Sequence, residues 1–361
     1  MQVKEYDLMN VAVMKNQKPK LTTMKYLQLF SVLLIIGIAS CKKGDNIDNI
    51  APTDLVVTAT VSNDSSGTVA FTATAKNAVS YEYDFGNGFS LTVLSGLTNY
   101  KYAASGTYTV TVTASSTSGQ TISKTLQVTV TVVLKLKWSD EFEVDGPPDP
   151  SKWGYDLGAG GWGNAELQNY TNRTDNSIVS NGTLKITAKS ESYNGSPYTS
   201  ARLLTKDKFS FKYGKVEASA KLPEGVGTWA AIWMLGDNIT TVGWPACGEI
   251  DIMEHLGRQL NKIYGTLHHP GHSGGNGDGS TTTISNATTE FHKYSVEWST
   301  ANIKISVDDV VFYNFINAGN LPFNHNFFII LNIAMGGNFG GAVDPAFTSG
   351  VMEIDYVRVY Q

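Results

Sequence analysis

Cysteine is almost absent from this chain of 361 residues, which contains only Cys41 and Cys247. Cys41 follows directly on an N-terminal apolar run, whereas Cys247 stands alone in the body of the chain. Two cysteines in such different settings do not form a disulfide framework. The folded protein must therefore be stabilised by its hydrophobic core, with a bound metal ion as the other available support.

Charge is also scarce, since Asp, Glu, Lys and Arg make up only 16% of the residues, and 32 acids outnumber 27 bases. A protein that binds nucleic acid by neutralising phosphates needs a basic surface, so the composition argues against that class and favours a neutral or mildly polar ligand. Hydrophobic residues, at 42%, suffice for a sizeable core. Long amphipathic helical patterns are missing and glycine is frequent, which predicts an all-β fold class.

No apolar run is long enough for a comfortable membrane span, which takes about 20 residues. The longest, residues 27–39, has 13 and follows several lysines, so residues 1–40 are predicted to be a secretory signal. A buried helix or a short membrane anchor is the alternative. The end of the run, residues 38–41 (IASC), resembles the lipobox of bacterial lipoproteins. The resemblance implies a lipid on Cys41 as the only membrane contact, a polar tether over 41–52, and a place at the bacterial cell surface, in the outer membrane or periplasm.

Residues 53–133 contain no Cys, His or Trp and alternate apolar with polar residues in several short runs. Such period-2 runs between Gly, Ser and Asn clusters predict a small β-sandwich. The passages 83–88 (YDFGNG) and 106–112 (GTYTVTV) resemble a polycystic-kidney-disease (PKD) domain of immunoglobulin-like fold, with Asn87 where an Asp is usual. We expect a spacer here, with weak glycan binding as the alternative.

Residues 134–361 hold all seven Trp and all six His, a shift of composition that predicts a domain boundary near 133. Short strand-like runs separated by Gly- and Asn-rich loops continue to the C-terminus. About 230 residues of this kind predict one large two-sheet sandwich of jelly-roll type.

The segment 248–255 (GEIDIMEH) is the most informative in the chain. In a strand, Glu249 and Asp251 share one face, but Glu254 has the wrong parity unless a one-residue bulge near Met253 corrects it. Three crowded carboxylates raise one another's pKa, and hydrolysis of a glycosidic bond uses one ionised and one protonated carboxyl group. An exposed acidic strand or a cation site is the alternative. Trp229, Trp233 and Trp244 lie shortly upstream, and aromatic faces suit a carbohydrate cleft.

The C-terminal part resembles glycoside hydrolase family 16, and within it the laminarinase-type endo-β-1,3-glucanases. Besides the acidic strand, the motifs that carry the resemblance are 138–142 (WSDEF), 162–168 (WGNAELQ), 200–202 (SAR), 228–235 (TWAAIWML), 265–268 (GTLH), 332–338 (NIAMGGN) and 354–360 (IDYVRVY). The resemblance implies a concanavalin-like β-jelly-roll sandwich with a curved cleft. It implies Glu249 as the nucleophile, Glu254 as the acid/base and Asp251 as the carboxylate that orients the nucleophile.

The same resemblance suggests sugar contacts at Trp229, Trp233, Trp244, Asn164 and Arg202, and places His268 beside the acid/base. A structural histidine is the alternative for His268. Phe339 stands where relatives often have Trp, so one edge of the cleft is expected to differ.

Metal chemistry is not expected in catalysis. Many relatives hold a structural calcium ion, for which Asp355 matches the side-chain ligand and backbone oxygens near Glu141 and Gly182 complete the set. The run His268-His269-X-X-His272 raises a zinc interpretation, which we set aside because no carboxylate partner is evident and the loop is rich in glycine. Cys247 is expected to be a small buried residue rather than a nucleophile.

Together these features predict a monomeric, lipid-anchored enzyme that cuts a β-1,3-glucan polysaccharide with retention and without a cofactor. Mixed-linkage β-1,3-1,4-glucan and algal galactan remain alternative substrates for the same chemistry. The alternative from another class is a non-catalytic, glycan-binding surface lipoprotein. Two intact, crowded glutamates argue against it.

Overall fold

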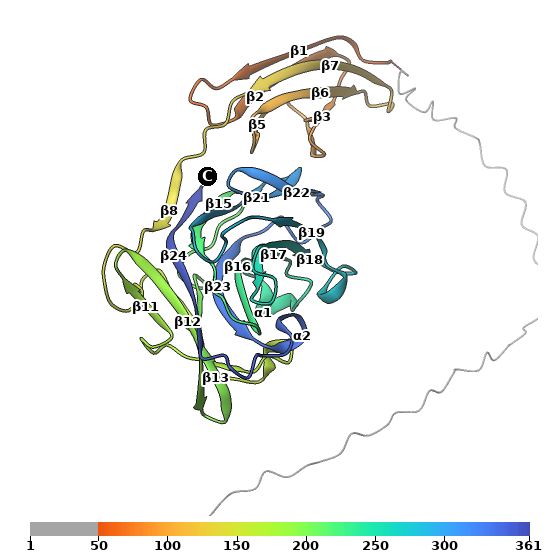
Figure 1. The fold of residues 1–361 in the computed structure, drawn as a ribbon. Helices are drawn as coiled ribbons and strands as arrows, with labels where there is room; N and C mark the ends of the chain where they lie inside the picture. Colours follow the sequence, from red (N-terminus) through yellow and green to blue (C-terminus); the bar gives the residue numbers. More distant parts are fainter. Residues whose placement is uncertain (1–49) are drawn as a thin grey trace, which may run out of the picture. The chain divides into compact units, whose positions relative to one another are not determined.

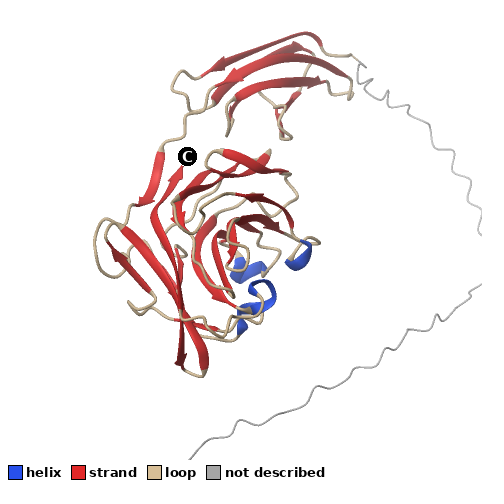
Figure 2. Cartoon of the chain, in the orientation of Figure 1, coloured by secondary structure: helices blue, strands red, loops and turns tan. Residues whose placement is uncertain are grey.

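The computed structural model describes residues 50–361 (Figure 1). The predicted signal sequence, the lipidation site Cys41 and nearly all of the predicted tether lie outside the described residues. Among residues 50–361, no helix is long and apolar enough to cross a membrane. Strands dominate this part of the chain, and the few helices are single turns (Figure 2).

The N-terminal sandwich consists of two antiparallel sheets. The first contains β1 (Thr53–Val61), β2 (Thr68–Lys76) and β5 (Leu97–Lys101). The second contains, in spatial order, β4 (Ser90–Val93), β3 (Ser80–Asp84), β6 (Gly106–Ser115) and β7 (Thr121–Val130). Buried and exposed residues alternate along β2, as the period of its apolar residues predicts. The buried set includes Phe71, Tyr83 and Phe85, whose rings pack together.

The C-terminal sandwich has a larger outer sheet of ten strands. Its main path runs β10 (Gln168–Tyr170), β13 (Ser196–Ser200), β12 (Thr183–Tyr193), β24 (Ser349–Tyr360), β15 (Gly214–Lys221), β20 (His292–Trp298), β21 (Asn302–Val307) and β22 (Val310–Ile316). Two further strands join it, β11 (Ser177–Ser180) on β12 and β8 (Leu136–Asp140) on β24.

The other sheet of this sandwich has seven strands and carries the predicted catalytic residues. Its order is β19 (Asp278–Thr283), β18 (Lys262–His268), β17 (Glu249–Leu256), β16 (Thr228–Gly236), β23 (Phe327–Met335), β14 (Arg202–Leu204) and β9 (Gly154–Asp156). The helical turns in the connecting loops are η1 (Gly161–Gly163), α1 (Ile239–Val242), η2 (Gly274–Asn276) and α2 (Gly337–Gly340).

The core of the C-terminal sandwich lies between these two sheets. One face of β23 supplies Phe327, Ile329, Leu331 and Ile333 to it, and the matching residues of β16 and β17 lie beside them. The other face of β23 is buried as well, so every residue of the strand is inaccessible. An all-β chain of two successive sandwiches agrees with the predicted fold class, and the second face of the seven-stranded sheet is where the site lies.

Candidate active site

A β-bulge in β17 decides which side chains reach the site. Asp251 pairs with Trp233 of β16, but the next pair along is Met253 with Ile232, so one extra residue lies between them. The register against β18 shifts at the same point. Ile252 and Met253 are therefore both buried in the core between the sheets. The bulge expected near Met253 is present, and Glu254 returns to the face of Glu249 and Asp251.

Glu249 begins β17 and retains some access to solvent. Trp244 donates a hydrogen bond from its indole Nε1 to Glu249 Oε2 at 2.8 Å, and about half of the Trp244 surface is exposed. On the other side, His268 Nε2 lies 3.7 Å from Glu249 Oε1. Burial, and after it the negative charge of Asp251, raise the pKa of Glu249 to about 8.

Asp251 lies deeper, with 3% of its surface exposed. One of its carboxylate oxygens lies within 4.8 Å of one of Glu249, and its Oδ2 atom lies 3.2 Å from His268 Nε2. Burial and the nearby charge of Glu254 raise its pKa well above the ordinary value. Two carboxyl groups this close hold a proton between them more readily than two negative charges.

Glu254 is held by two donors on neighbouring strands. Trp229 Nε1 donates to Oε1 at 2.9 Å, and Thr266 Oγ1 donates to Oε2 at 3.2 Å. The side chain is nearly buried, and this burial is the main cause of its raised pKa. A raised pKa makes a carboxyl group hold its proton more firmly, as a general acid requires.

The third tryptophan of the expected set, Trp233, is fixed from two sides. Its indole Nε1 donates to Asn332 Oδ1 of β23 at 2.8 Å. The Arg202 guanidinium lies over its ring at 4.8 Å and is paired with Asp156 at 3.0 Å. The structure therefore brings Trp233 and Arg202 together on the same sheet as the three carboxyl groups. Trp229 and Trp233 are half-buried.

Asn164 belongs to a buried polar network that the sequence did not reveal. Glu166 accepts hydrogen bonds from Asn164 Nδ2 at 3.3 Å and from Gln168 Nε2 at 2.6 Å. The Tyr170 hydroxyl also donates to Glu166, at 3.4 Å, and accepts from Asn332 Nδ2 at 2.9 Å. Burial raises the pKa of Glu166. The Asn164 side chain is thus already engaged by Glu166, and Asn332 links this network to Trp233.

One signal in the sequence pointed to Asn332. It is the only polar residue in the buried strand β23, FFIILNIAM. An amide in such a run must find hydrogen-bond partners, which here are side chains of the site. Thr266 gave no such signal, because it lies in an alternating strand. Phe339, at the position expected to differ, packs edge-on against the rings of Trp229 and Tyr264.

The residues expected around calcium lie on the outer sheet, away from the three carboxyl groups. Asp355 is exposed on β24, between the point where β12 stops pairing and the point where β8 starts. Gly182 precedes β12 and Glu141 follows β8, so both flank this junction. The Glu141 side chain is engaged by Arg358 through two hydrogen bonds, of 3.0 and 2.8 Å. Only the backbone oxygen of Glu141 is thus available to an ion.

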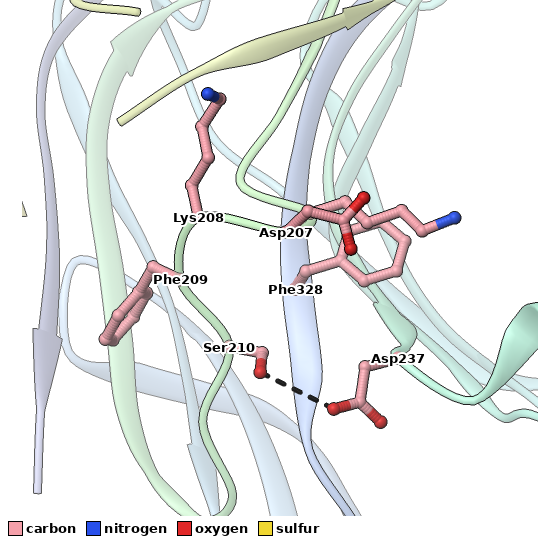
Figure 3. Close-up of a pocket in the computed structure, with 7 residues that line it drawn as sticks. Asp207, Lys208, Phe209, Ser210, Asp237 and Phe328 are labelled. Carbon is pink, nitrogen blue, oxygen red and sulfur yellow. Dashed lines mark hydrogen bonds between the residues drawn. The ribbon is translucent and has the colours of Figure 1, made fainter. Parts of the chain in front are cut away.

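A pocket of about 280 Å³ opens near one end of β23 (Figure 3). Phe328 and the Ser210–Asp237 hydrogen bond of 3.5 Å line it, together with Lys206, Asp207, Lys208 and Phe209. None of the three carboxyl groups of β17 lines this pocket. Cys247 is fully buried and its pKa is raised to about 11 by burial, which agrees with a packing role.

Comparisons with known proteins place this geometry in a family. The sequence profile of "Glycosyl hydrolases family 16" matches residues 164–358, and that of "PKD domain" matches residues 54–132. A beta-glucanase of Rhodothermus marinus is 46% identical over 243 residues, which are 63% of this chain and 85% of the relative.

Solved structures give the same result. The laminarinase from Rhodothermus marinus matches with a TM-score of 0.61 and 46% identity, over 63% of this chain and 98% of that one. A LamA variant from Zobellia galactanivorans, in complex with laminaritriose and laminaritetraose, matches with a TM-score of 0.58 and 45% identity, over the same shares.

Proposed function

This chain belongs to glycosyl hydrolase family 16, and on that premise we propose that it is a retaining endo-β-1,3-glucanase of the laminarinase kind. The observation that carries the proposal is the bulge of β17, which aligns Glu249, Asp251 and Glu254 on one face. A strand without the bulge would bury Glu254 among apolar side chains, where an acid without partners costs several kcal/mol.

The reaction follows from the two glutamates. Ionised Glu249 attacks the anomeric carbon and forms a glycosyl–enzyme ester, while Glu254 gives its proton to the departing glycosidic oxygen. Glu254, now ionised, then takes a proton from water, whose oxygen displaces Glu249 from the same carbon. Two inversions give net retention, and both glutamates return to their starting protonation states.

The surroundings of the two glutamates act on their charge in different ways. The hydrogen bond from Trp244 favours the ionised form of Glu249, which is the form that attacks, whereas burial and the charge of Asp251 raise its pKa to about 8. Burial favours the protonated form of Glu254. In the second half of the reaction Glu254 carries the charge, and the donors Trp229 and Thr266 stabilise it.

The substrate is proposed from the relatives and from the aromatic side chains around the carboxyl groups. Relatives named beta-glucanase and laminarinase match across the whole C-terminal sandwich, and one was solved with laminari-oligosaccharides. The half-exposed ring of Trp244, hydrogen-bonded to Glu249, offers a face on which a sugar ring can stack next to the point of attack.

The experiment is release of reducing ends from laminarin by the wild type, by Glu249→Ala and by Glu297→Ala. Glu297 is an exposed glutamate of β20 and serves as the matched control. Mixed-linkage glucan and agarose are tested in parallel. Activity on laminarin that only Glu249→Ala abolishes supports the proposal. Activity on another glycan alone replaces the substrate, and binding without cleavage of any glycan favours the glycan-capturing alternative.

We also propose that Cys41 anchors the enzyme to a bacterial membrane as a lipoprotein, with the PKD domain as a spacer and the chain as a monomer. The lipobox-like residues 38–41 support the anchor. Labelling with a radioactive fatty acid tests it, because the label should appear on the wild type and be lost from Cys41→Ser.

We propose, finally, a structural calcium ion at the junction of β8, β12 and β24. Asp355 is skipped in the register between β15 and β24, since Ser219 pairs with Tyr356 and Ala220 with Ile354. It lies at a break in the ladder, flanked by backbone of residues 141 and 182, and oxygen donors of this kind suit calcium. Chelation should lower the melting temperature of the wild type and not that of Asp355→Asn.

A further inference from the structure

The loop between β18 and β19 places two histidines side by side. His269 and His272 exchange two backbone hydrogen bonds, each of 2.9 Å, across the turn formed by Pro270 and Gly271. Proline fixes φ at the first turn position, and Gly271 supplies the positive φ of 85° needed at the second. Residues that exchange both bonds point their side chains to the same face, so the backbone itself pairs the two imidazoles.

The imidazoles share one carboxylate. The rings lie 4.8 Å apart and nearly parallel, at 19°. His269 Nε2 lies 2.9 Å from Asp278 Oδ2, and His272 Nδ1 lies 2.9 Å from Asp278 Oδ1. His269 is almost fully buried, with its ring against those of Phe315 and Phe323. One ligand atom from each of the three residues lies within 4.8 Å of the other two.

We propose that His269, His272 and Asp278 bind a zinc-class divalent cation, with the remaining position open to water. Two imidazole nitrogens and a carboxylate oxygen are a donor set that zinc accepts and that magnesium and calcium do not favour. The carboxylate that the sequence did not reveal is Asp278, nine residues after His269 and at the start of β19.

A second histidine–aspartate pair shows what is particular about this cluster. His292 Nδ1 lies 2.7 Å from Asp308 Oδ2, with a single imidazole at the carboxylate. The other oxygen, Asp308 Oδ1, accepts from the backbone N–H of Lys293 at 2.9 Å, so this carboxylate is satisfied without a second imidazole. At Asp278 two imidazoles converge, each on its own oxygen, and the turn and β19 hold all three before any ligand arrives. Such preorganisation lowers the entropy that ordering the ligands costs.

The ion would fix the loop behind a residue of the active site. Gly277, next to Asp278, lies so close to His268 that a Cβ atom on it would fall 2.6 Å from the His268 ring. His268 in turn lies 3.2 Å from Asp251. The proposed role is therefore to hold the loop that positions His268, without contact between the ion and the substrate.

The test measures zinc bound to the full chain, freed of metal and kept in excess calcium so that any calcium effect is constant. Zinc per chain is counted after gel filtration, and the melting temperature is recorded with and without zinc. The variants are His272→Ala and Asp278→Asn at the site, His292→Ala as the matched control, and Glu249→Gln. The last removes a ligand from the second candidate cluster, Glu249, Asp251 and His268.

We expect one zinc ion per wild-type chain and a rise in melting temperature of about 2 °C or more at saturation. His272→Ala and Asp278→Asn should weaken binding at least tenfold, whereas His292→Ala and Glu249→Gln should bind as the wild type does. Magnesium should give no shift. No zinc on the wild type, or full binding by both site variants, overturns the proposal. Binding that only Glu249→Gln abolishes assigns the ion to the carboxyl cluster and overturns it as well.

Discussion

The two sandwiches of this chain bury their strands differently. In the PKD domain, β2 alternates buried and exposed residues along most of its length. In the catalytic domain, all nine residues of β23 are buried, and seven of the eight residues of β17 are buried too. A sheet covered on one face needs only a core, whereas a sheet covered on both faces has a second layer of side chains. In this enzyme that second layer contains the carboxyl groups of β17 and the tryptophans that contact them.

The hydrogen-bond partners of the buried aromatic side chains also differ between the two domains. The hydrogen-bonded tyrosines of the PKD core, Tyr83 and Tyr102, donate to backbone carbonyls of Gly96 and Phe85, which closes the fold. In the catalytic domain Trp229, Trp233 and Trp244 donate to side chains instead. Two of these three indoles donate to carboxyl groups whose pKa is raised, a combination that is typical of reactive sites. The predictions below test this contrast.

The largest effect on activity is expected from Glu254→Gln. Glutamine has nearly the same shape as glutamic acid but cannot donate the proton that the leaving group needs. The rate on laminarin should fall about 10³-fold, within the range for loss of a general acid. A β-laminaribioside with a dinitrophenyl leaving group needs no protonation, so formation of the glycosyl–enzyme should be nearly unaffected. Stopped-flow release of dinitrophenol measures it. An equal loss on both substrates would contradict the assigned role, and Glu297→Gln is the control.

Asn332→Leu should have the next largest effect. The substitution converts β23 into an uninterrupted apolar strand. It leaves the Trp233 indole N–H without its acceptor and removes the donor to the Tyr170 hydroxyl, which keeps its bond to Glu166. An unsatisfied buried group costs about 1–3 kcal/mol, so the melting temperature should fall by several degrees. Activity should fall about tenfold, mostly through KM, because Trp233 loses its fixed orientation. Unchanged KM would show that Asn332 serves packing alone.

Glu249→Gln should change the pH dependence of stability. The pKa of Glu249 is raised from an ordinary 4.5 to about 8, so the folded state binds this proton more tightly than the unfolded state does. The resulting stability is fully present below about pH 4.5 and is lost as the pH rises to about 8. Glutamine needs no proton, so the variant should melt several degrees above the wild type at pH 8.5 and close to it at pH 4.5. Thermal melts of both proteins from pH 4.5 to pH 8.5 measure the difference. A difference in melting temperature that does not change with pH would contradict the prediction.

The smallest effect is expected from deletion of residues 53–133. If the PKD domain is a spacer, kcat and KM on soluble laminarin should stay within twofold of the full chain. A large loss on the soluble substrate would show that the PKD domain contributes to the site. A loss only on an insoluble glucan would point to glycan capture by that domain.

The sequence predicted the features that depend on residues close together in the chain. Glu249 and Glu254 are five residues apart, so they can share one face of a strand only if a bulge lies between them. The register of β17 against β16 and β18 shows this bulge. The fold class followed from the period of apolar residues. What the sequence could not show is which distant residues meet: Asn332 accepts from Trp233 at a separation of 99 residues. Such contacts depend on the order of strands in the sheet, which local patterns do not determine.

The proposed zinc site also depends on a contact that the sequence pattern did not reveal, here between residues only nine positions apart. The three histidines from 268 to 272 were visible, but their carboxylate was not. Asp278 reaches His269 because β18 and β19 pair with Leu267 opposite Asp278. His268, the last residue of β18, lies beside Asp251, whereas His269, which follows the strand, lies beside Asp278, so the run of histidines is divided between two clusters.

The indole hydrogen bonds of the active site have one more consequence. Trp244 and Trp229 each donate their indole N–H to a carboxyl group that changes charge during turnover. A sugar that turns either ring must alter the proton affinity of its glutamate, and a change of charge must alter how firmly the ring is held. Sugar binding and proton binding are therefore thermodynamically linked in this active site.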